Sequence, residues 1–283
     1  MYLMPLVERL GRRRLNALGL HSRYADTPLG PLHFYESRSP GDLPPIVVLH
    51  GFGASATSFG PVLARLRGRS RRLLAPEAPG HGFSRATRGP VTVDAAFDAV
   101  ADLLRRTLDE PALLFGNSLG GAMAIRFAAT APDRVRGLVL SSPAGAPMAA
   151  DEFEAVVRSF RVGSLHDGVA LVHRLYHQAP WYAPLLAADI LRHFREPALR
   201  GLLDSFSPQD LLTPDEVAAI TAPTLLLWGR SERLLPNRGL DFFRSSLPAH
   251  ATIEEPEDFG HCPNLDRPAQ LAERIAAFAR AHP

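Results

Sequence analysis

Ser118 stands between glycines in the segment LLFGNSLGGAM (residues 113–123), where an apolar stretch meets a helical pattern. The apolar residues before it are typical of a buried strand, and the spacing after it is typical of a helix. In a G-x-S-x-G sequence the serine lies on a tight strand-to-helix turn, which exposes its hydroxyl at the edge of a sheet. Unpaired N–H groups at the helix start would face any negative charge that develops there. The pattern therefore predicts a nucleophilic serine with part of an oxyanion hole.

Candidates for the base and the acid that such a serine needs follow it in the chain. A serine hydroxyl is a poor nucleophile unless a base removes its proton, and an acid must orient the base. Glu232 lies four residues beyond Trp228, after the apolar segment TLLLWG, and His261 lies between the last predicted strand and the last predicted helix. This order of serine, acid and histidine is the one used when the nucleophile sits on a strand-to-helix turn. The spacing predicts a catalytic triad.

The hydrophobic pattern supplies alternating strands and helices to position these side chains. Alternation in residues 21–37 predicts a hairpin of two strands with a Pro/Gly turn. Segments typical of buried parallel strands follow at 44–51, 71–77, 112–116, 137–142, 224–229 and 251–255, and helical spacing occurs at 91–110, from 120 to about 132 and at 268–281. This order predicts an α/β fold with a mostly parallel, eight-stranded sheet and helices on both faces.

Residues 146–219 break the alternation. This stretch holds no convincing strand, and its short helical patterns are separated by prolines. We expect a helical cap inserted after the sixth strand. The division would then be a core of residues 1–145 and 220–283, with an N-terminal helix in 1–18, and a cap of residues 146–219.

Composition narrows the possible partners. The chain has 283 residues, 46% of them hydrophobic, which is enough for a sizeable core. Its 31 basic residues are all arginine and are spread along the chain, so nucleic-acid binding is not indicated. The single cysteine, Cys262, permits no intrachain disulfide, and no Cys/His cluster has the spacing of a zinc site. We expect no metal.

The N-terminal segment 1–18 carries apolar residues ahead of its arginines, which reverses the order found in a signal peptide. Its uninterrupted apolar run is far shorter than the roughly 20 residues that a membrane span needs. We expect a cytoplasmic protein. The N-terminal helix would pack on the body of the protein or, as the less favoured alternative, make peripheral contact with anionic lipid.

With these residues in place, the chain from about residue 21 to 281 resembles the α/β-hydrolase family. Besides the Ser118 motif, the segments LHGFG (49–53) and PEAPGHGFS (76–84) match family loops, the second with Glu77 where aspartate is common. The resemblance implies acyl transfer without a cofactor, and an oxyanion hole made by the backbone N–H groups of Phe52 and Leu119. The histidines of the two loops, His50 and His81, are expected to shape the loops.

The acid departs from the usual family pattern, because aspartate is commoner where Glu232 stands. Some branches of the family use glutamate, which can still accept a hydrogen bond from a histidine N–H. Family members can also place the acid after the sixth strand, but the segment LVLSSPAGAP there contains no carboxylate. That absence favours Glu232.

Within the family, the chain most resembles the bacterial lipase/esterase and monoacylglycerol-lipase branch. The resemblance implies a small ester substrate whose apolar acyl chain is bound by cap residues, for which Tyr176, Trp181 and Tyr182 are candidates. The alternative within the family is the branch that hydrolyses carbon–carbon bonds in meta-cleavage products of aromatic rings. Members of that branch generally carry tryptophan after the catalytic histidine, where this chain has Cys262, which we expect to pack beside the site.

Two alternatives belong to other functional classes. Gly51, Gly53 and Ala56 follow a predicted strand as G-x-G-x-x-A, and Glu77 comes 21 residues after Ala56, as in a dinucleotide-binding oxidoreductase. The preceding hairpin and the poor helix start after Gly53 count against that reading, which would also leave the triad order as coincidence. A non-catalytic binding module is the other alternative, and the complete triad disfavours it.

Overall fold

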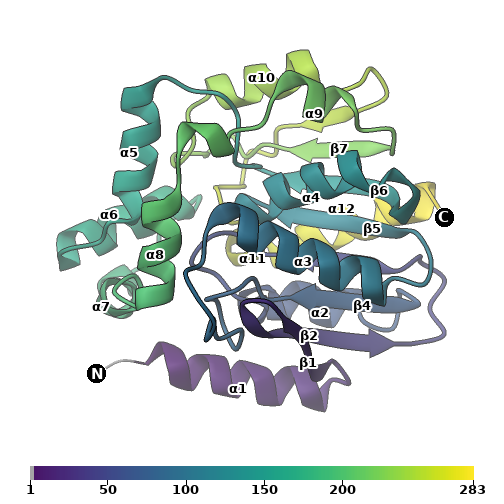
Figure 1. The fold of residues 1–283 in the computed structure, drawn as a ribbon, viewed down its shortest axis with the longest axis horizontal. Helices are drawn as coiled ribbons and strands as arrows, with labels where there is room; N and C mark the ends of the chain where they lie inside the picture. The colour runs from purple at the N-terminus through teal and green to yellow at the C-terminus, as the bar shows by residue number, and fades with distance from the viewer. Residues whose placement is uncertain (1–2) are drawn as a thin grey trace.

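The computed structural model describes residues 3–283, which form a single eight-stranded sheet with helices on both faces (Figure 1). The strand order is β1-β2-β4-β3-β5-β6-β7-β8, in which β1 pairs antiparallel with β2, β2 pairs antiparallel with β4, and the remaining neighbours are parallel. The predicted α/β-hydrolase fold is confirmed. The strands are β1 (His21–Thr27), β2 (Gly30–Arg38), β3 (Ile46–Leu49), β4 (Arg72–Pro76), β5 (Ala112–Asn117), β6 (Val135–Ser141), β7 (Thr224–Leu227) and β8 (Thr252–Glu254).

Two apolar clusters hold the helices to the sheet, one on each face. Neighbouring residues of β5 alternate between them, because Leu114 belongs to one cluster and Leu113 and Phe115 belong to the other. The strand is therefore buried on both faces, which explains its continuous apolar sequence. The core helices are α1 (Met4–Ala17), α2 (Gly60–Leu66), α3 (Val93–Thr107), α4 (Leu119–Thr130), α10 (Arg238–Ser246), α11 (Pro263–Asp266) and α12 (Pro268–Ala281), with 3-10 turns η1 (Ala56–Phe59) and η2 (Pro132–Arg134).

Only helices occur between β6 and β7. They are α5 (Ala150–Phe160), α6 (Leu165–Leu175), α7 (Ala183–His193), α8 (Pro197–Ser205), η3 (Pro208–Asp210) and α9 (Pro214–Ala218). We call residues 146–219 the cap segment. Its helices α5 to α8 lie beyond the carboxyl ends of the parallel strands, whereas α9 packs back against α4 and α10 (Figure 1). The division of the chain into a core and a separate cap domain stays a prediction.

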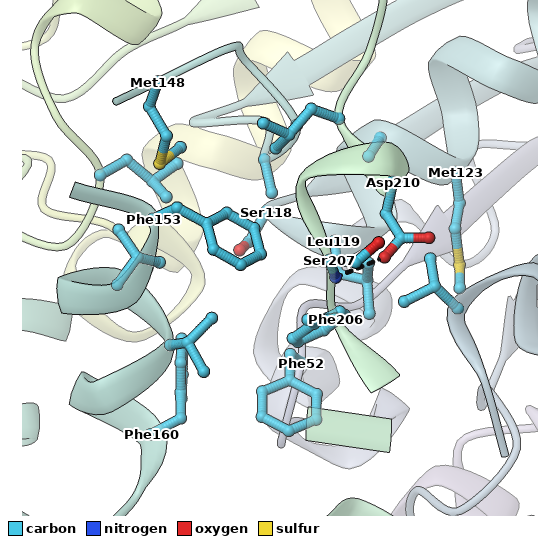
Figure 2. A pocket seen from close by; sticks show the side chains of 18 of the residues that line it. Phe52, Ser118, Leu119, Met123, Met148, Phe153, Phe160, Phe206, Ser207 and Asp210 are labelled. Carbon is cyan, nitrogen blue, oxygen red and sulfur yellow. Dashed lines mark hydrogen bonds between the residues drawn. The ribbon is translucent and has the colours of Figure 1, made fainter. Parts of the chain in front are cut away.

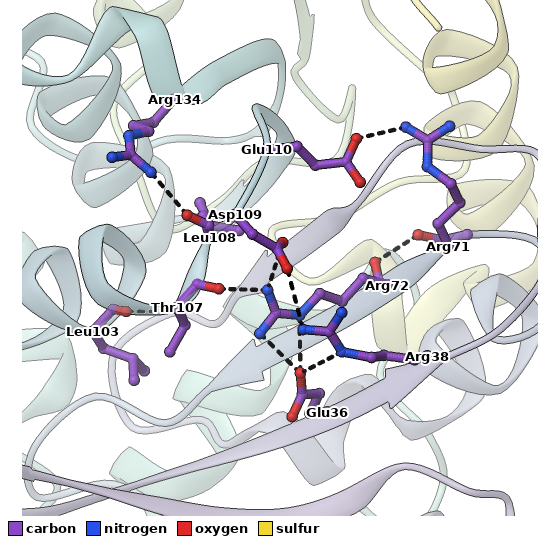
Figure 3. A network of polar contacts seen from close by, with 11 residues as sticks. Glu36, Arg38, Arg71, Arg72, Leu103, Thr107, Leu108, Asp109, Glu110 and Arg134 are labelled. Atoms are coloured by element: carbon purple, nitrogen blue, oxygen red, sulfur yellow. Dashed lines mark hydrogen bonds and ion pairs between the residues drawn. The ribbon is translucent and has the colours of Figure 1, made fainter.

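A buried arginine ties the antiparallel strands to the end of α3. The Arg72 side chain of β4 is only 8% exposed, and its Nε lies 2.9 Å from Glu36 Oε1 on β2. The same guanidinium donates to Asp109 Oδ1 at 3.0 Å and to the carbonyl oxygen of Thr107 (Figure 3). Because all of its strong donors have acceptors, this charge can be buried at little cost.

Helix α1 lies along β1 and also contacts α2 and η1 (Figure 1). Its inward face buries Leu15 completely and leaves Glu8 half-buried. Burial, together with the charge of Glu77, raises the pKa of Glu8 from 4.5 to about 7, and a hydrogen bond with Ser55 offsets part of the rise. The predicted N-terminal helix is present as α1 and packs on the body of the protein, while residues 1–2 of the predicted segment lie outside the described residues.

Replacing Glu8 with glutamine is expected to stabilise the protein only at higher pH. The pKa of Glu8 in the folded protein lies above the unfolded value of 4.5. Below pH 4.5 the carboxyl is protonated in both states and costs no stability, whereas its ionised form destabilises the fold as the pH rises through about 7. At about pH 8, Glu8→Gln should raise the free energy of unfolding by roughly 1–2 kcal/mol, and at pH 4.5 the two proteins should be equal. Urea denaturation at both pH values measures this. A gain of the same size at both would contradict it.

Candidate active site

Ser118 has an unusual backbone conformation at the junction of β5 and α4. Its φ is 53° and its ψ is −120°, in a region that non-glycine residues rarely adopt. The conformation is held on both sides: Ser118 N donates to Ser141 O at 3.1 Å, and Ser118 O accepts from Gly121 N at 2.8 Å. The turn therefore fixes the direction of the Ser118 side chain through the backbone, as the sequence predicted.

The glycines around Ser118 are required by close backbone contacts. A Cβ on Gly116 would lie 2.3 Å from the carbonyl oxygen of Gly120, and a Cβ on Gly120 would lie 2.4 Å from Leu49 O on β3. A side chain on Gly51 would also approach Ser118 Cβ, at 3.1 Å. Glycine at these positions lets α4 start directly against the strands that carry the site.

His261 and Glu232 form a buried pair. His261 Nδ1 lies 2.8 Å from Glu232 Oε2, and both side chains are almost fully covered. The second carboxylate oxygen accepts from the backbone N–H groups of Leu234 and Leu235, at 2.7 and 3.0 Å. Burial alone would raise the pKa of Glu232, but the charge of His261 and the hydrogen bonds from His261 and Leu235 hold it below its usual range. Glutamate thus reaches the histidine and stays ionised.

The residue before the serine links the serine turn to the histidine loop. The buried Asn117 amide donates to His261 O at 2.9 Å and to Ser141 O at 3.1 Å. These two bonds hold the histidine loop against the end of β5. Sequence reasoning gave Asn117 no role, because its partners lie 144 and 24 residues away.

Two cavities meet at Ser118. The His261 cavity contains Ser118 and His261 and is lined by Met4, Gly51, Phe52, Gly53, Ala54, Ser58, Phe59, Asn117, Ser118, Phe160, Leu175, Ile190, His193, Phe194, His261, Cys262, Asn264 and Leu265. The second, which we call the apolar cavity and which Figure 2 shows, shares Phe52, Ser118 and Phe160 with the first, and His261 is not among its lining residues. Ser118 can therefore present one group of a bound molecule to each cavity.

The apolar cavity is walled by aliphatic and aromatic side chains, with a short polar end. Figure 2 shows Phe153, Phe160, Phe52 and Phe206 around the approach to Ser118. The polar end consists of Arg126, Ser207 and Asp210, which are already paired with one another or with neighbours. The remaining lining residues are Val93, Phe97, Leu119, Ala122, Met123, Ala144, Gly145, Met148, Val156, Val157, Leu211, Leu234 and Leu235.

Two histidines hold the loop of residues 51–53, one at the backbone N–H of Gly53 and the other at its carbonyl oxygen. Gly53 N donates to His81 Nε2 at 3.0 Å, and His193 Nε2 of α7 donates to Gly53 O at 2.9 Å. Burial lowers the pKa of both histidines, so both are neutral. Among residues 3–283, no group accepts a hydrogen bond from the backbone N–H of Phe52 or of Leu119. Both amides are thus available beside Ser118.

The fold and this geometry agree with comparisons to known proteins. A model of the alpha/beta hydrolase family matches residues 46–274, which is most of the chain. The chain belongs to that family. Among its curated relatives, Lipase 1 of Psychrobacter immobilis is 25% identical over 83% of this chain and 76% of its own length. Human monoacylglycerol lipase ABHD6 is 24% identical over 92% of this chain and 82% of its own length.

Solved structures of the family superpose over nearly the whole chain. A membrane phospholipase A described as a bacterial virulence factor has a TM-score of 0.83 and 25% identity, and the match covers 99% of this chain and 93% of that one. The 2-hydroxy-6-oxo-6-phenylhexa-2,4-dienoate hydrolase of Rhodococcus sp. strain RHA1 has a TM-score of 0.77 and 20% identity, with 92% and 99% covered. The second likeness concerns the fold alone.

The three aromatic residues predicted to bind substrate do not line either cavity of this family member. Trp181 is 89% exposed and Tyr182 is 41% exposed, both at the start of α7. Tyr176 ends α6, and its backbone packs against Gly260, beside the histidine loop. Their part in substrate binding stays a prediction, and the aromatic rings that line the apolar cavity with Ser118 include those of Phe153, Phe160 and Phe206.

Helical spacing could have identified part of that lining. Phe153, Val156, Val157 and Phe160 stand at the i, i+3, i+4 and i+7 positions of α5 and all line the apolar cavity. By contrast, no sequence signal marks the bonds that join α6 to the histidine loop. Asp266 is the key residue there, because its carboxylate accepts from His177 N at 2.9 Å and from Gly260 N at 2.8 Å.

Cys262 and His50, which the sequence analysis also named, have structural positions around the site. Cys262 lines the His261 cavity, and burial raises the pKa of its thiol, which keeps it protonated and unreactive. His50 Nε2 accepts from Ala78 N at 3.0 Å and so joins the two family loops.

Within residues 3–283 no cluster of three or more His, Cys, Asp or Glu side chains could hold a metal ion. Over the same range, no helix has the length and apolar character to cross a membrane.

The glycine requirement predicts contrasting effects of two alanine substitutions. Gly120→Ala places a Cβ against backbone that cannot move without shifting β3, so it should lower the free energy of unfolding by about 3 kcal/mol or more. Gly201→Ala in α8 meets open space and should raise the free energy of unfolding by roughly 0.5–1 kcal/mol. Urea denaturation of both variants checks this, and equal stability of the two would refute the close-contact argument.

Proposed function

We propose that this chain is a serine hydrolase that cleaves carboxylic esters of apolar acyl chains through an acyl-enzyme. The observation that carries the proposal is the position of Ser118, which lies where the two cavities meet, while His261 lines only one of them. An ester has two parts on either side of its carbonyl carbon. The two cavities provide a separate place for each.

The proposed reaction starts with proton transfer from Ser118 Oγ to His261 Nε2. His261 Nδ1 faces Glu232, which leaves Nε2 as the proton acceptor and provides a negative charge for the imidazolium. Ser118 Oγ then forms a bond with the ester carbonyl carbon, and the carbonyl oxygen becomes an oxyanion. The free amides of Phe52 and Leu119 would donate to that oxygen. No metal or organic cofactor takes part in this scheme.

The position of His261 decides which part of the ester occupies which cavity. When the tetrahedral intermediate collapses, the imidazolium must give its proton to the leaving alkoxide, so the alcohol has to lie on the histidine side. The alcohol therefore occupies the His261 cavity and the acyl chain occupies the apolar cavity. Water then enters from the histidine side, loses a proton to His261 and hydrolyses the acyl-enzyme.

The lining of the apolar cavity supports an aliphatic acyl chain. Each methylene buried there contributes roughly 0.8 kcal/mol, until the cavity is filled. The relatives named lipase and monoacylglycerol lipase, both near one quarter identical, support the same class of substrate. A monoacylglycerol suits the arrangement better than a triacylglycerol, because only one chain has an apolar wall on the acyl side.

Hydrolysis of a carbon–carbon bond in a ring-cleavage product is the second candidate, favoured by the fold likeness to a hydrolase of that class. Such a substrate carries a carboxylate, which needs a free cation. The only basic side chain in the apolar cavity is Arg126, whose Nε lies 3.3 Å from Glu216. Its guanidinium also donates to Asp210 O. Because Arg126 is already paired with Glu216 and Asp210, it is not free to bind the substrate carboxylate. This favours the ester as the substrate over the dienol-carboxylate.

A fluorophosphonate probe should label Ser118 and no other residue. The probe reacts with a serine that a histidine activates, so wild-type protein should take up one label, and Ser118→Ala should take up none. Ser118→Ala should also lose ester hydrolysis by several orders of magnitude. The matched control is Ser159→Ala, which alters a half-buried serine of α5 that lines neither cavity and should label as wild type does. Labelling that survives Ser118→Ala would refute the assignment.

A panel of substrates tests the substrate class. On p-nitrophenyl esters, kcat/KM should rise from acetate to medium-length chains, by up to roughly fourfold for each buried methylene, and then fall once the cavity is full. Monoacylglycerols should react faster than triacylglycerols. A 2-hydroxy-6-oxo-dienoate ring-cleavage product, at matched concentration, should react poorly. If carbon–carbon cleavage exceeded hydrolysis of every ester, the ester proposal would be wrong.

A further inference from the structure

Helix α1 turns an apolar face away from the protein. Leu6, Val7 and Leu10 are 54%, 61% and 52% exposed, although the opposite face of the helix buries Leu15. A surface helix in contact only with water normally carries polar residues on its outer face. In α1, the apolar residue Leu15 faces the protein and is covered. Leu6, Val7 and Leu10 face outward and are not covered by the chain.

A second exposed apolar surface continues from the start of α1. The backbone N–H of Leu3 donates to Asp189 Oδ1 of α7 at 2.8 Å. Leu185 lies one turn before Asp189 in α7 and is 66% exposed, and Trp181, two residues before the helix begins, is 89% exposed. The N-terminal end of α1 also lies near α7 in Figure 1. We call this continuous surface, made by Leu6, Val7, Leu10, Trp181 and Leu185, the α1–α7 face.

Positive charge borders this face. The exposed Arg9 and Arg13 lie on one flank of the outer stripe of α1, and Arg14 lies within the stripe, one turn after Leu10. A groove between α1 and the β1–β2 hairpin is lined by four arginines, including Arg85, and by no carboxylate. The only acid of α1 is Glu8, on the inward side. The protein as a whole has a formal net charge of only +2, so this is a local feature.

The α1–α7 face adjoins the outer wall of the His261 cavity. Met4 of α1, Ile190 of α7 and Leu265 of α11 all line that cavity, and Leu265 is 38% exposed. Elements that carry the exposed apolar residues therefore also form the side of the cavity that faces solvent. A molecule that approached along this face would meet the site on the histidine side.

We propose that the α1–α7 face docks onto an anionic lipid bilayer. An apolar stripe flanked by arginines is the pattern of a helix that lies in the plane of a membrane, with its apolar residues among the acyl chains and its arginines at the lipid phosphates. The side chain of Trp181, which is 89% exposed, is also suited to the boundary between lipid headgroups and hydrocarbon, because it has an apolar ring and a polar N–H. A second copy of this chain would bring the same arginines to the same surface, and their charges would repel. The charge pattern therefore selects an anionic lipid surface.

Docking has a consequence that rests on the proposed function. With the α1–α7 face on the bilayer, the outer wall of the His261 cavity lies at the lipid surface. An ester lipid could then pass from the membrane to Ser118 without crossing water, which would favour substrates with apolar chains.

Co-sedimentation of the full-length protein with vesicles tests the docking, with Ser118→Ala used so that no lipid is hydrolysed. The protein should bind vesicles of phosphatidylcholine mixed with phosphatidylglycerol, should bind phosphatidylcholine vesicles far less, and should dissociate at high salt. Arg13→Glu should lower binding to the anionic vesicles by roughly fivefold or more. Its matched control, Arg280→Glu, changes an exposed arginine of α12 near the opposite end of the molecule and should bind as the parent does.

Leu6→Gln with Leu10→Gln tests the apolar stripe, and thermal unfolding establishes that this variant is folded. Binding to anionic vesicles should fall at least as far as in Arg13→Glu. The proposal is overturned if the Ser118→Ala parent binds neither vesicle or both equally, or if the double variant binds undiminished. It is also overturned if gel filtration shows a dimer that the double variant dissociates. Hydrolysis of a soluble short-chain ester is measured separately, with the same substitutions in protein that keeps Ser118, so loss of the proposed function and loss of docking are distinguishable.

Discussion

The site depends on one close approach of backbone to backbone, at the point where α4 starts against the strands. Gly116, Gly120 and Leu49 come so near to each other that no Cβ fits between them, and the chain must turn from β5 into α4 within one residue. That residue is Ser118, whose positive φ is the local cost of the turn. Residues of β5 are buried in both apolar clusters and residues of α4 in one of them, so the packing of these two elements holds the serine in its direction.

The loops that complete the site are held by the cap segment as well as by the sheet. His193 of α7 bonds to Gly53 O in the loop with the free Phe52 amide, and the end of α6 bonds to the histidine loop through Leu175 O and Cys262 N at 3.0 Å. The Asp266 carboxylate accepts hydrogen bonds from His177 N, just after α6, and from Gly260 N, in the histidine loop. A movement of α6 and α7 would therefore shift the oxyanion amide and the histidine together, which makes the cap segment part of the geometry of the site and not only its cover.

The sequence predicted what short-range patterns encode. Apolar periodicity located all eight strands, and the glycine spacing around Ser118 predicted the turn, because both follow from contacts between near neighbours in the chain. It could not indicate Asn117, His193 or Asp266 as residues that hold the site together, since each has a partner 89 to 144 residues away. The cap aromatics were chosen by residue type, and the sequence could not show that Trp181 is 89% exposed, because its exposure depends on how the cap segment packs.

In the proposed reaction, Phe52 takes part in both substrate selection and catalysis. Its ring lies between the two cavities and contacts the rings of Phe160, Phe194 and Phe206 at centroid distances of 5.1, 5.6 and 5.3 Å. Its backbone N–H is one of the two free amides beside Ser118. A molecule that displaces the ring, because it is too wide for the apolar cavity, would also rotate the amide away from the reacting oxygen. Poorly fitting acyl groups would then lose transition-state stabilisation as well as binding, so that the cavity selects substrates through the rate of the reaction in addition to their affinity.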